Sequence, residues 1–185
     1  MTPRTTGETR LPGDPTPRET VERAIRVDHA GEYGAKRIYE GQLAVLGRTK
    51  WRATLEHMKE QEQVHLDTFS RLIGERRVRP TALLPVWHVA GFALGAATAL
   101  LGHRGAMACT VAVEEAIDEH YRAQEEALGE DEAELKAHIA KFRAEELEHR
   151  DIGLENEAEQ APAYRLLSAA IKAGCKVAIR LSERI

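Results

Sequence analysis

Two stretches of the sequence carry a glutamate and a histidine three residues apart, Glu62 with His65 and Glu146 with His149. Residues at this spacing share one face of a helix. Such a pair alone is a weak signal, because glutamate is abundant in this chain. Its weight comes from placement, since both pairs fall on the apolar stripe of their segments. A carboxylate and an imidazole in that position are typical of metal ligation.

Two further glutamates, Glu32 and Glu114, lie on the apolar stripes of two other segments. The order along the chain is therefore Glu, Glu-x-x-His, Glu, Glu-x-x-His. Glu32 precedes Glu62 by thirty residues, and Glu114 precedes Glu146 by thirty-two. The chain thus consists of two halves that nearly repeat.

Four carboxylates in a protein interior repel one another, and each unpaired charge there costs several kcal/mol. No lysine or arginine lies on the four stripes to balance them. Two divalent ions would neutralise the set, and oxygen ligands with imidazole suit iron or manganese. The sequence therefore predicts a two-metal site, as in ferritin-like bundles. The alternative is that these residues are surface charges on misassigned helices. The predicted metal ligands are Glu32, Glu62, His65, Glu114, Glu146 and His149.

The elements that must position these residues are all helical, because the apolar periodicity is that of helices and no strand pattern competes. We expect helices at 18–46, at 51–73 with Gly74 closing it, from the turn at 102–105 to Gly129, at about 135–153, and at about 163–183. The fold class is all-α, a ferritin-like four-helix bundle with a di-metal centre. An apolar helical element and a C-terminal amphipathic helix are added to it.

The apolar element is Leu83–Gly102, within an insertion at about 81–105, and it carries no formal charge. Its length approaches that of a membrane span, but Pro85 and three glycines make it a poor one. A buried helix, a helix lying on or in one leaflet, and a true span all remain open.

Basic residues recur every fourth position in the last predicted helix: Lys172, Lys176, Arg180 and Arg184. Three more arginines, Arg76, Arg77 and Arg79, precede the apolar element. Such residues form either a solvated surface or a contact with anionic lipid.

The bulk composition bounds the class of protein. A chain of 185 residues supports one domain, which we place at 18–185, after a disordered tail at 1–17 that lacks an apolar signal region. A net charge of −4 gives no case for nucleic acid as a partner. Two distant cysteines exclude a disulfide framework or a zinc knuckle.

Five segments of the sequence together resemble the demethoxyubiquinone hydroxylase family of ubiquinone biosynthesis. The resemblance runs from about Thr20 to the C-terminus. It is more specific than the ligand spacing, because the apolar and C-terminal segments match too. The segments are RVDHAGEYGAKRIYEGQ, VRPTALLPVWHVAGFALGAATALLG, GAMACTVAVEEAIDEHY, EELEHRDIGL and APAYRLL with AGCKVAIRLSERI.

The resemblance implies a di-iron monooxygenase that hydroxylates the ring of a polyprenylated quinone with O2 and two electrons. The six predicted ligands match the family's iron ligands, with Glu62 or Glu146 as a candidate bridge between the ions. The family also implies NADH as a candidate electron donor, although the sequence has no GxGxxG loop. It further implies a lipid-binding accessory protein. The expected location is peripheral, on the cytoplasmic face of a bacterial inner membrane or, in a eukaryote, on the matrix face of the mitochondrial inner membrane. The oligomeric state stays open, a homo-oligomer included.

Tyr121 lies seven residues after Glu114 on the same face, and we consider it as a substrate contact, a redox-active phenol or plain core packing. Asp28, one turn before Glu32, could orient a ligating histidine, and His120 is either beside the ligands or on the surface. Two other functions share these features. One is a ferritin- or rubrerythrin-type protein that stores iron or reduces peroxide, and the other is a metal-free, membrane-attached helical scaffold.

Overall fold

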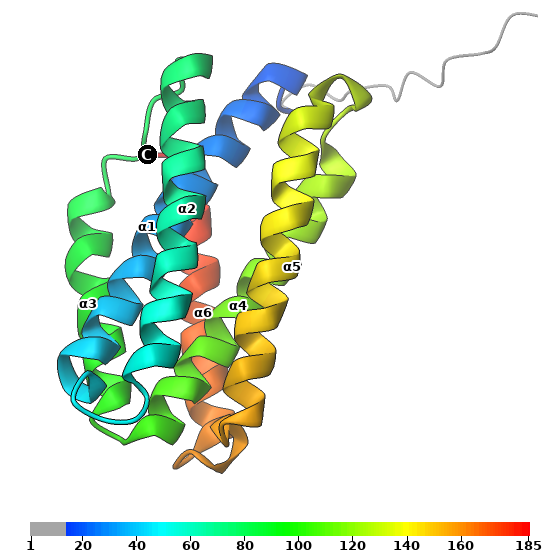
Figure 1. Ribbon diagram of the computed structural model, residues 1–185. Helices are drawn as coiled ribbons and strands as arrows, with labels where there is room; N and C mark the ends of the chain where they lie inside the picture. Colours follow the sequence, from blue (N-terminus) through cyan, green and yellow to red (C-terminus); the bar gives the residue numbers. More distant parts are fainter. Residues whose placement is uncertain (1–13) are drawn as a thin grey trace, which may run out of the picture.

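The computed structural model describes residues 14–185, which contain helices and no strand. The all-α prediction is confirmed. Of the predicted tail, residues 1–13 lie outside the described part, and the first helix begins at Pro17. The helices are α1 (Pro17–Leu46), α2 (Arg52–Arg76), α3 (Leu84–Ala99), α4 (His103–Ala127), α5 (Ala133–Glu155) and α6 (Tyr164–Ser182), with single 3-10 turns η1 (Glu130–Glu132) and η2 (Ala158–Gln160) (Figure 1).

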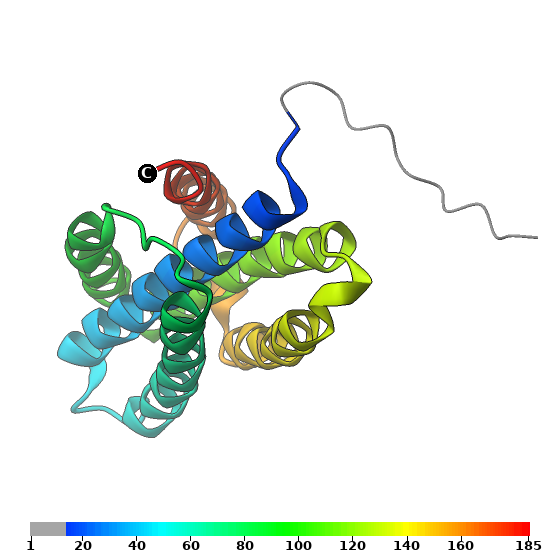
Figure 2. The ribbon, with the colours of Figure 1, turned by 90° about the horizontal axis from the view of Figure 1, so that it is seen from above.

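The helices form a bundle of two hairpins with a further helix packed on each. Helices α1 and α2 form one hairpin, and α4 and α5 form the other. Helix α3 lies in the long connection between the hairpins and packs on α1, while α6 packs on α4. Seen from above, α3 and α6 lie on the side of α1 opposite to α2 and α5 (Figure 2). We call α3 and α6 the outer layer.

Local sequence signals set the helix ends. At the start of α1, the Thr16 side chain accepts a hydrogen bond from the Glu19 backbone, and the Glu19 carboxylate accepts one from the Thr16 backbone. This capping box satisfies two otherwise unpaired amides. Gly47 ends α1 as predicted. Helix α2 ends two residues after the predicted Gly74, inside the basic turn at 74–80 that was predicted to close it: the helix continues to Arg76, and Arg77 adopts a left-handed conformation (φ 53°).

Two apolar clusters fill the bundle, one on each side of the layer that holds the predicted ligands. One contains Tyr39, Leu55, Met58 and Met107. The other contains Ile25, Phe69, Tyr121, Ile139 and Phe142. Because both clusters are buried, they close the polar layer off from water at its two ends.

Glycines let the backbones of α3 and α1 touch. A Cβ atom added to Gly95 would lie 2.7 Å from the carbonyl carbon of Ile38 and closer still to its oxygen. One added to Gly91 would lie 2.7 Å from the Gly34 oxygen, and one added to Gly41 would lie 2.7 Å from the Ala96 nitrogen. The small residues of the apolar segment therefore serve helix packing.

Helix α3 is neither fully buried nor a membrane span. Its glycine face is covered by α1, whereas Val86 and Val89 on its other face are 51% and 66% exposed. Within residues 14–185, no helix combines the length and the apolar composition that crossing a membrane requires.

The basic stripe of α6 divides into two parts. Lys172 forms an ion pair with Glu115 of α4, and Lys176 forms one with Glu119 at 2.8 Å. Exposed ion pairs contribute little free energy, but these two align α6 along α4. Arg180 and Arg184, nearer the end of the helix, are exposed.

Candidate metal centre

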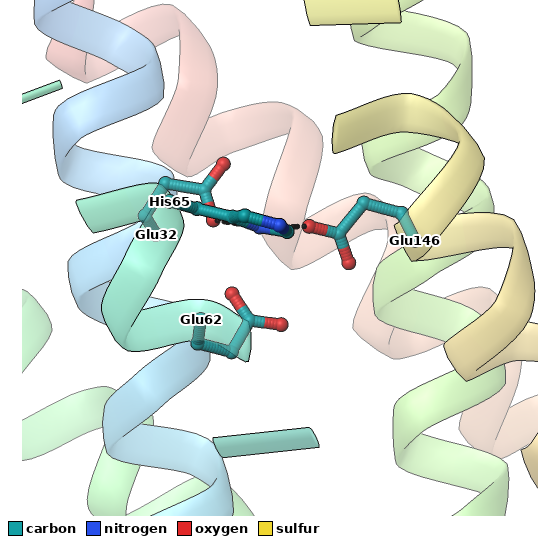
Figure 3. A group of neighbouring side chains, drawn as sticks. All are labelled: Glu32, Glu62, His65 and Glu146. Atoms are coloured by element: carbon teal, nitrogen blue, oxygen red, sulfur yellow. Dashed lines mark hydrogen bonds and ion pairs between the residues drawn. The ribbon is translucent and has the colours of Figure 1, made fainter. Parts of the chain in front are cut away.

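The six predicted ligands converge between the two hairpins, and each is at most 2% exposed. They form two groups whose candidate ligand atoms lie within 4.8 Å of one another. The His65 group is Glu32, Glu62, His65 and Glu146, and the His149 group is Glu62, Glu114, Glu146 and His149. Glu62 and Glu146 belong to both groups, which is the arrangement that two adjacent ions with bridging carboxylates require. Figure 3 shows the His65 group, with residues from α1, α2 and α5 pointing toward one another.

The same nitrogen of each imidazole faces the carboxylates. His65 Nδ1 lies 3.0 Å from Glu146 Oε1 and 3.3 Å from Glu32 Oε2. His149 Nδ1 lies 3.2 Å from Glu146 Oε2 and 3.3 Å from Glu62 Oε1. Nδ1 is therefore the atom that each histidine offers to a metal.

The opposite nitrogen of each imidazole has a partner on the other hairpin. His65 Nε2 lies 2.7 Å from Glu145 Oε2, and His149 Nε2 lies 2.8 Å from Gln61 Oε1. With Nδ1 left free for a metal, Nε2 carries the proton and donates these two hydrogen bonds, which fix the ring orientation. Neither Glu145 nor Gln61 was predicted from the sequence. Their position in the sequence, directly before the ligands Glu146 and Glu62, was the signal that could have identified them.

Two tyrosines hold the remaining carboxylates. Tyr121 of α4 donates a hydrogen bond to Glu32 Oε1, and Tyr39 of α1 donates one to Glu114 Oε1 at 2.8 Å. Each tyrosine lies seven residues after the glutamate of its own helix and contacts the glutamate of the other helix. Tyr121 thus lies at the site, and Tyr39, which was not predicted to lie there, occupies the corresponding position on the other side.

The matched tyrosines relate the two hairpins by an approximate twofold symmetry, in which α1 corresponds to α4. Two glutamines follow the same symmetry. Gln124 donates a hydrogen bond to Asp28 Oδ1 at 2.7 Å, and Gln42 lies 3.5 Å from Thr110 Oγ1. Asp28 and Thr110 each precede the glutamate of their helix by four residues. Asp28 also pairs with His120 Nε2 at 3.3 Å. In this structure Asp28 therefore orients His120 and Gln124. It does not orient a predicted metal ligand.

Unpaired buried atoms test whether metal ions fit the site. Both carboxylate oxygens of Glu62, and one oxygen each of Glu32, Glu114 and Glu146, make no hydrogen bond to any described residue. Three of these five oxygens face an imidazole Nδ1 at 3.2–3.3 Å, the atom that would bind a metal. A buried polar atom without a partner costs about 1–3 kcal/mol. Divalent cations would supply the missing partners, so the residues present fit the expected group.

Electrostatics favour the same conclusion. Burial raises the pKa of Glu62 well above its ordinary value, and the charges of Glu146 and Glu32 raise it further. Burial also raises the pKa of Glu114, again reinforced by Glu146. Both carboxyls are therefore costly to ionise unless cations lie beside them.

The two histidines stabilise the charge of Glu146. Burial would raise the pKa of this carboxyl, but its interactions with His149 and His65 outweigh burial and lower the pKa to about 2. Burial would lower the pKa of His65, yet its hydrogen bonds to Glu146 and Glu32 raise it to about 12. The pKa of His149 is raised in the same way. The positive charge of the His65 imidazole thus offsets part of the carboxylate charge in the metal-free protein, as cations would.

An all-helical double hairpin in which buried glutamates and histidines converge from four helices defines the ferritin-like carboxylate–histidine class. Within that class the chain belongs to the family of the ubiquinone biosynthesis protein COQ7, whose family model matches residues 19–182. The resemblance found in the sequence is confirmed.

Named relatives cover most of the chain. A 3-demethoxyubiquinol 3-hydroxylase of Rhodospirillum rubrum is 63% identical over 98% of this chain and 86% of its own length. A mitochondrial NADPH-dependent 3-demethoxyubiquinone 3-hydroxylase of Bos taurus is 62% identical over 91% of this chain and 79% of its own length. A mitochondrial 5-demethoxyubiquinone hydroxylase of Saccharomyces cerevisiae is 40% identical over 89% and 78%, respectively.

Proposed function

We propose that this chain hydroxylates the ring of a polyprenylated demethoxyquinone in ubiquinone biosynthesis, with O2, two electrons and two iron ions. The observation that carries the proposal is the pair of buried ligand groups that share Glu62 and Glu146. The family and the names of the relatives supply the substrate class. They do not support a storage protein or a metal-free scaffold.

Iron bound here would supply the activation of O2 that organic side chains lack. The chain itself binds the ions through the six ligands and fixes the imidazoles through Glu145 and Gln61. Tyr121 and Tyr39 hold the two outer carboxylates in place. The two apolar clusters keep water from the reacting atoms, which protects the oxidising site from side reactions.

The outer layer is the surface that we assign to the membrane. Eight of the ten large hydrophobic residues that are exposed in the described chain lie in or beside α3 and α6: Val86, Val89, Leu100, Leu101, Leu166, Val177, Leu181 and Ile185. Arg180 and Arg184 lie at the end of the same layer, where they would meet anionic lipid headgroups.

A path for the isoprenoid tail would run from this layer to the metals. Ile38, Cys109, Ala112 and Ile171 form an apolar cluster that joins the inner helices to α3 and α6. In this proposal a substrate dissolved in the bilayer approaches the site through this apolar packing, which must open to admit it. Peripheral attachment to the inner membrane, a lipid-binding accessory protein and self-association are further parts of this proposal, as is the assignment of residues 18–185 to one di-iron domain.

The electron donor in this proposal is a reduced nicotinamide. The Bos taurus relative is named NADPH-dependent, and we expect NADPH or NADH to serve here. Comparing the two cofactors under identical conditions, with product formation as the readout, identifies the donor.

The test of the function uses protein loaded anaerobically with iron, supplied with a demethoxyquinone, a reduced nicotinamide and ¹⁸O2. We expect two metal ions per chain by elemental analysis and one ¹⁸O atom in the quinone ring by mass spectrometry. Iron oxidation that leaves the quinone unchanged would point to the storage or peroxide-reducing alternative. Far less than two ions per chain would favour the scaffold.

A further inference from the structure

We propose that the two metal positions are chemically inequivalent and that Glu145 makes them so, with the His65 group binding the first and tighter ion. The inference rests on the proposed function, because it concerns the same metal centre. Glu145 acts as a positioning residue, through His65, and is not itself a ligand.

The evidence is the difference between two otherwise matched hydrogen bonds. His65 Nε2 lies 2.7 Å from a carboxylate oxygen of Glu145, whereas His149 Nε2 lies 2.8 Å from an amide oxygen of Gln61. The geometry is nearly the same, and both acceptors precede a shared ligand by one residue. Only the charge of the acceptor differs.

A charged acceptor changes what the imidazole offers to a metal. A carboxylate polarises the Nε2–H bond more than an amide does and increases the electron density at Nδ1, which strengthens the metal bond. The partner of a ligating histidine typically changes metal affinity by about 10–100-fold. The ion in the His65 group therefore has the more basic imidazole.

Glu145 is partly open to solvent and has a cationic neighbour. Its side chain is 26% exposed, and Lys141 Nζ lies 3.6 Å from its second oxygen. Lys141 contacts one carboxylate oxygen and His65 the other. Lys141 offsets part of the charge without contacting the imidazole hydrogen bond.

Most of the remaining contacts match, with one exception at Nδ1: His65 Nδ1 faces the unshared Glu32, whereas His149 Nδ1 faces the shared Glu62. Exchanging the Nε2 acceptors leaves this difference in place, so the exchange separates its effect from that of Glu145. Glu32 and Glu114 each accept a hydrogen bond from a tyrosine of the opposite helix. Both groups share Glu62 and Glu146. The Asp28–His120 pair is a further departure from the twofold relation, but it contacts neither imidazole.

The test follows Co²⁺ binding to the full-length, metal-free protein by visible absorbance. Crystals with one equivalent of Co²⁺ then give the anomalous peak height at each position. We expect two binding steps and a higher peak beside His65. Glu145→Gln keeps a hydrogen-bond acceptor of the same shape and removes only the charge, so a purely structural role would leave binding unchanged. We expect it to weaken the first step about tenfold.

Two further variants complete the design. Glu148→Gln removes the same charge from an exposed position of α5 and should leave both steps unchanged. The double variant Glu145→Gln/Gln61→Glu exchanges the two acceptors, and we expect the higher anomalous peak to move to His149. Circular dichroism in EDTA checks that each variant is folded.

The possible failures are distinguishable. Equal peaks in the native protein, or a first dissociation constant that Glu145→Gln does not change, would overturn the inference and leave the metal centre intact. A native protein that binds no Co²⁺ at all would refute the metal centre of the proposed function together with the inference.

Discussion

The close packing of α3 on α1 predicts that adding one methyl group at this contact destabilises the protein. In Gly95→Ala the new Cβ would lie 2.7 Å from the carbonyl carbon of Ile38, well inside van der Waals contact. The obstacle is helix backbone, which cannot rotate away as a side chain would. The helices must therefore separate, and α3 must lose part of its packing.

The magnitude follows from two opposing effects. Overpacking of this kind costs about 1–3 kcal/mol, and rigid backbone places this site near the upper end. Replacing a helical glycine by alanine returns about 0.5–1 kcal/mol. We expect a net loss of about 1–2 kcal/mol in the free energy of unfolding. For a protein of this size that lowers Tm by about 2–8 °C.

A matched control isolates the steric effect. Gly174 lies in the interior of α6, is exposed, and has nothing within 4 Å of an added Cβ. Gly174→Ala should therefore raise Tm by a few degrees. The assay is calorimetry of the metal-free protein, with urea unfolding as a second measurement. If Gly95→Ala proves as stable as Gly174→Ala, α3 does not pack on α1 as described.

Three other predictions concern the site. Glu146→Ala should abolish binding of both ions and the hydroxylation activity while the helical circular dichroism spectrum is kept, because Glu146 belongs to both ligand groups; retained turnover would contradict the assignment. Tyr121→Phe and Tyr39→Phe each remove one hydroxyl donor from a buried carboxylate. A hydrogen bond to a charged group contributes about 1.5–3 kcal/mol, so both variants should weaken metal binding alike. A much larger loss of turnover in Tyr121→Phe alone would assign that phenol a role in the reaction. The stability of the metal-free protein should fall as pH rises from 7 to 9. Folding raises the pKa of Glu62 and that of His65. The stability that their protons contribute is therefore present below the unfolded pKa values and is lost as pH rises through the folded ones. Calorimetry across this range measures the change in Tm with pH, and a rising Tm would contradict the prediction.

The sequence was sufficient to predict the helices and the six converging residues because both depend on helical periodicity. Glu32 and Glu114 were identifiable as buried because they interrupt apolar stripes. The exact end of α2 did not follow from Gly74, because this glycine keeps a helical conformation instead of the left-handed one that ends a helix. There the chain leaves the helix at Arg77, in a left-handed conformation.

The hydrogen bonds between the two hairpins could not be predicted from the periodicity of a single helix. Glu145 and Gln61 lie beside the stripe of their own helix, and their partners are histidines of the opposite hairpin. Tyr39 could have been found, because its spacing from Glu32 repeats that of Tyr121 from Glu114. A buried tyrosine on an apolar stripe is equally compatible with plain core packing, so the position alone does not identify it.

The near-twofold relation of the hairpins carries a consequence for how such a protein can diversify. A homodimer of one hairpin would present identical residues to both ions, and any substitution would appear twice. Joining the hairpins in a single polypeptide gives each copy its own codons, so that position 61 can hold an amide while position 145 holds an acid. Carrying both halves in one polypeptide thus allows the residues around one ion to change independently of the residues around the other.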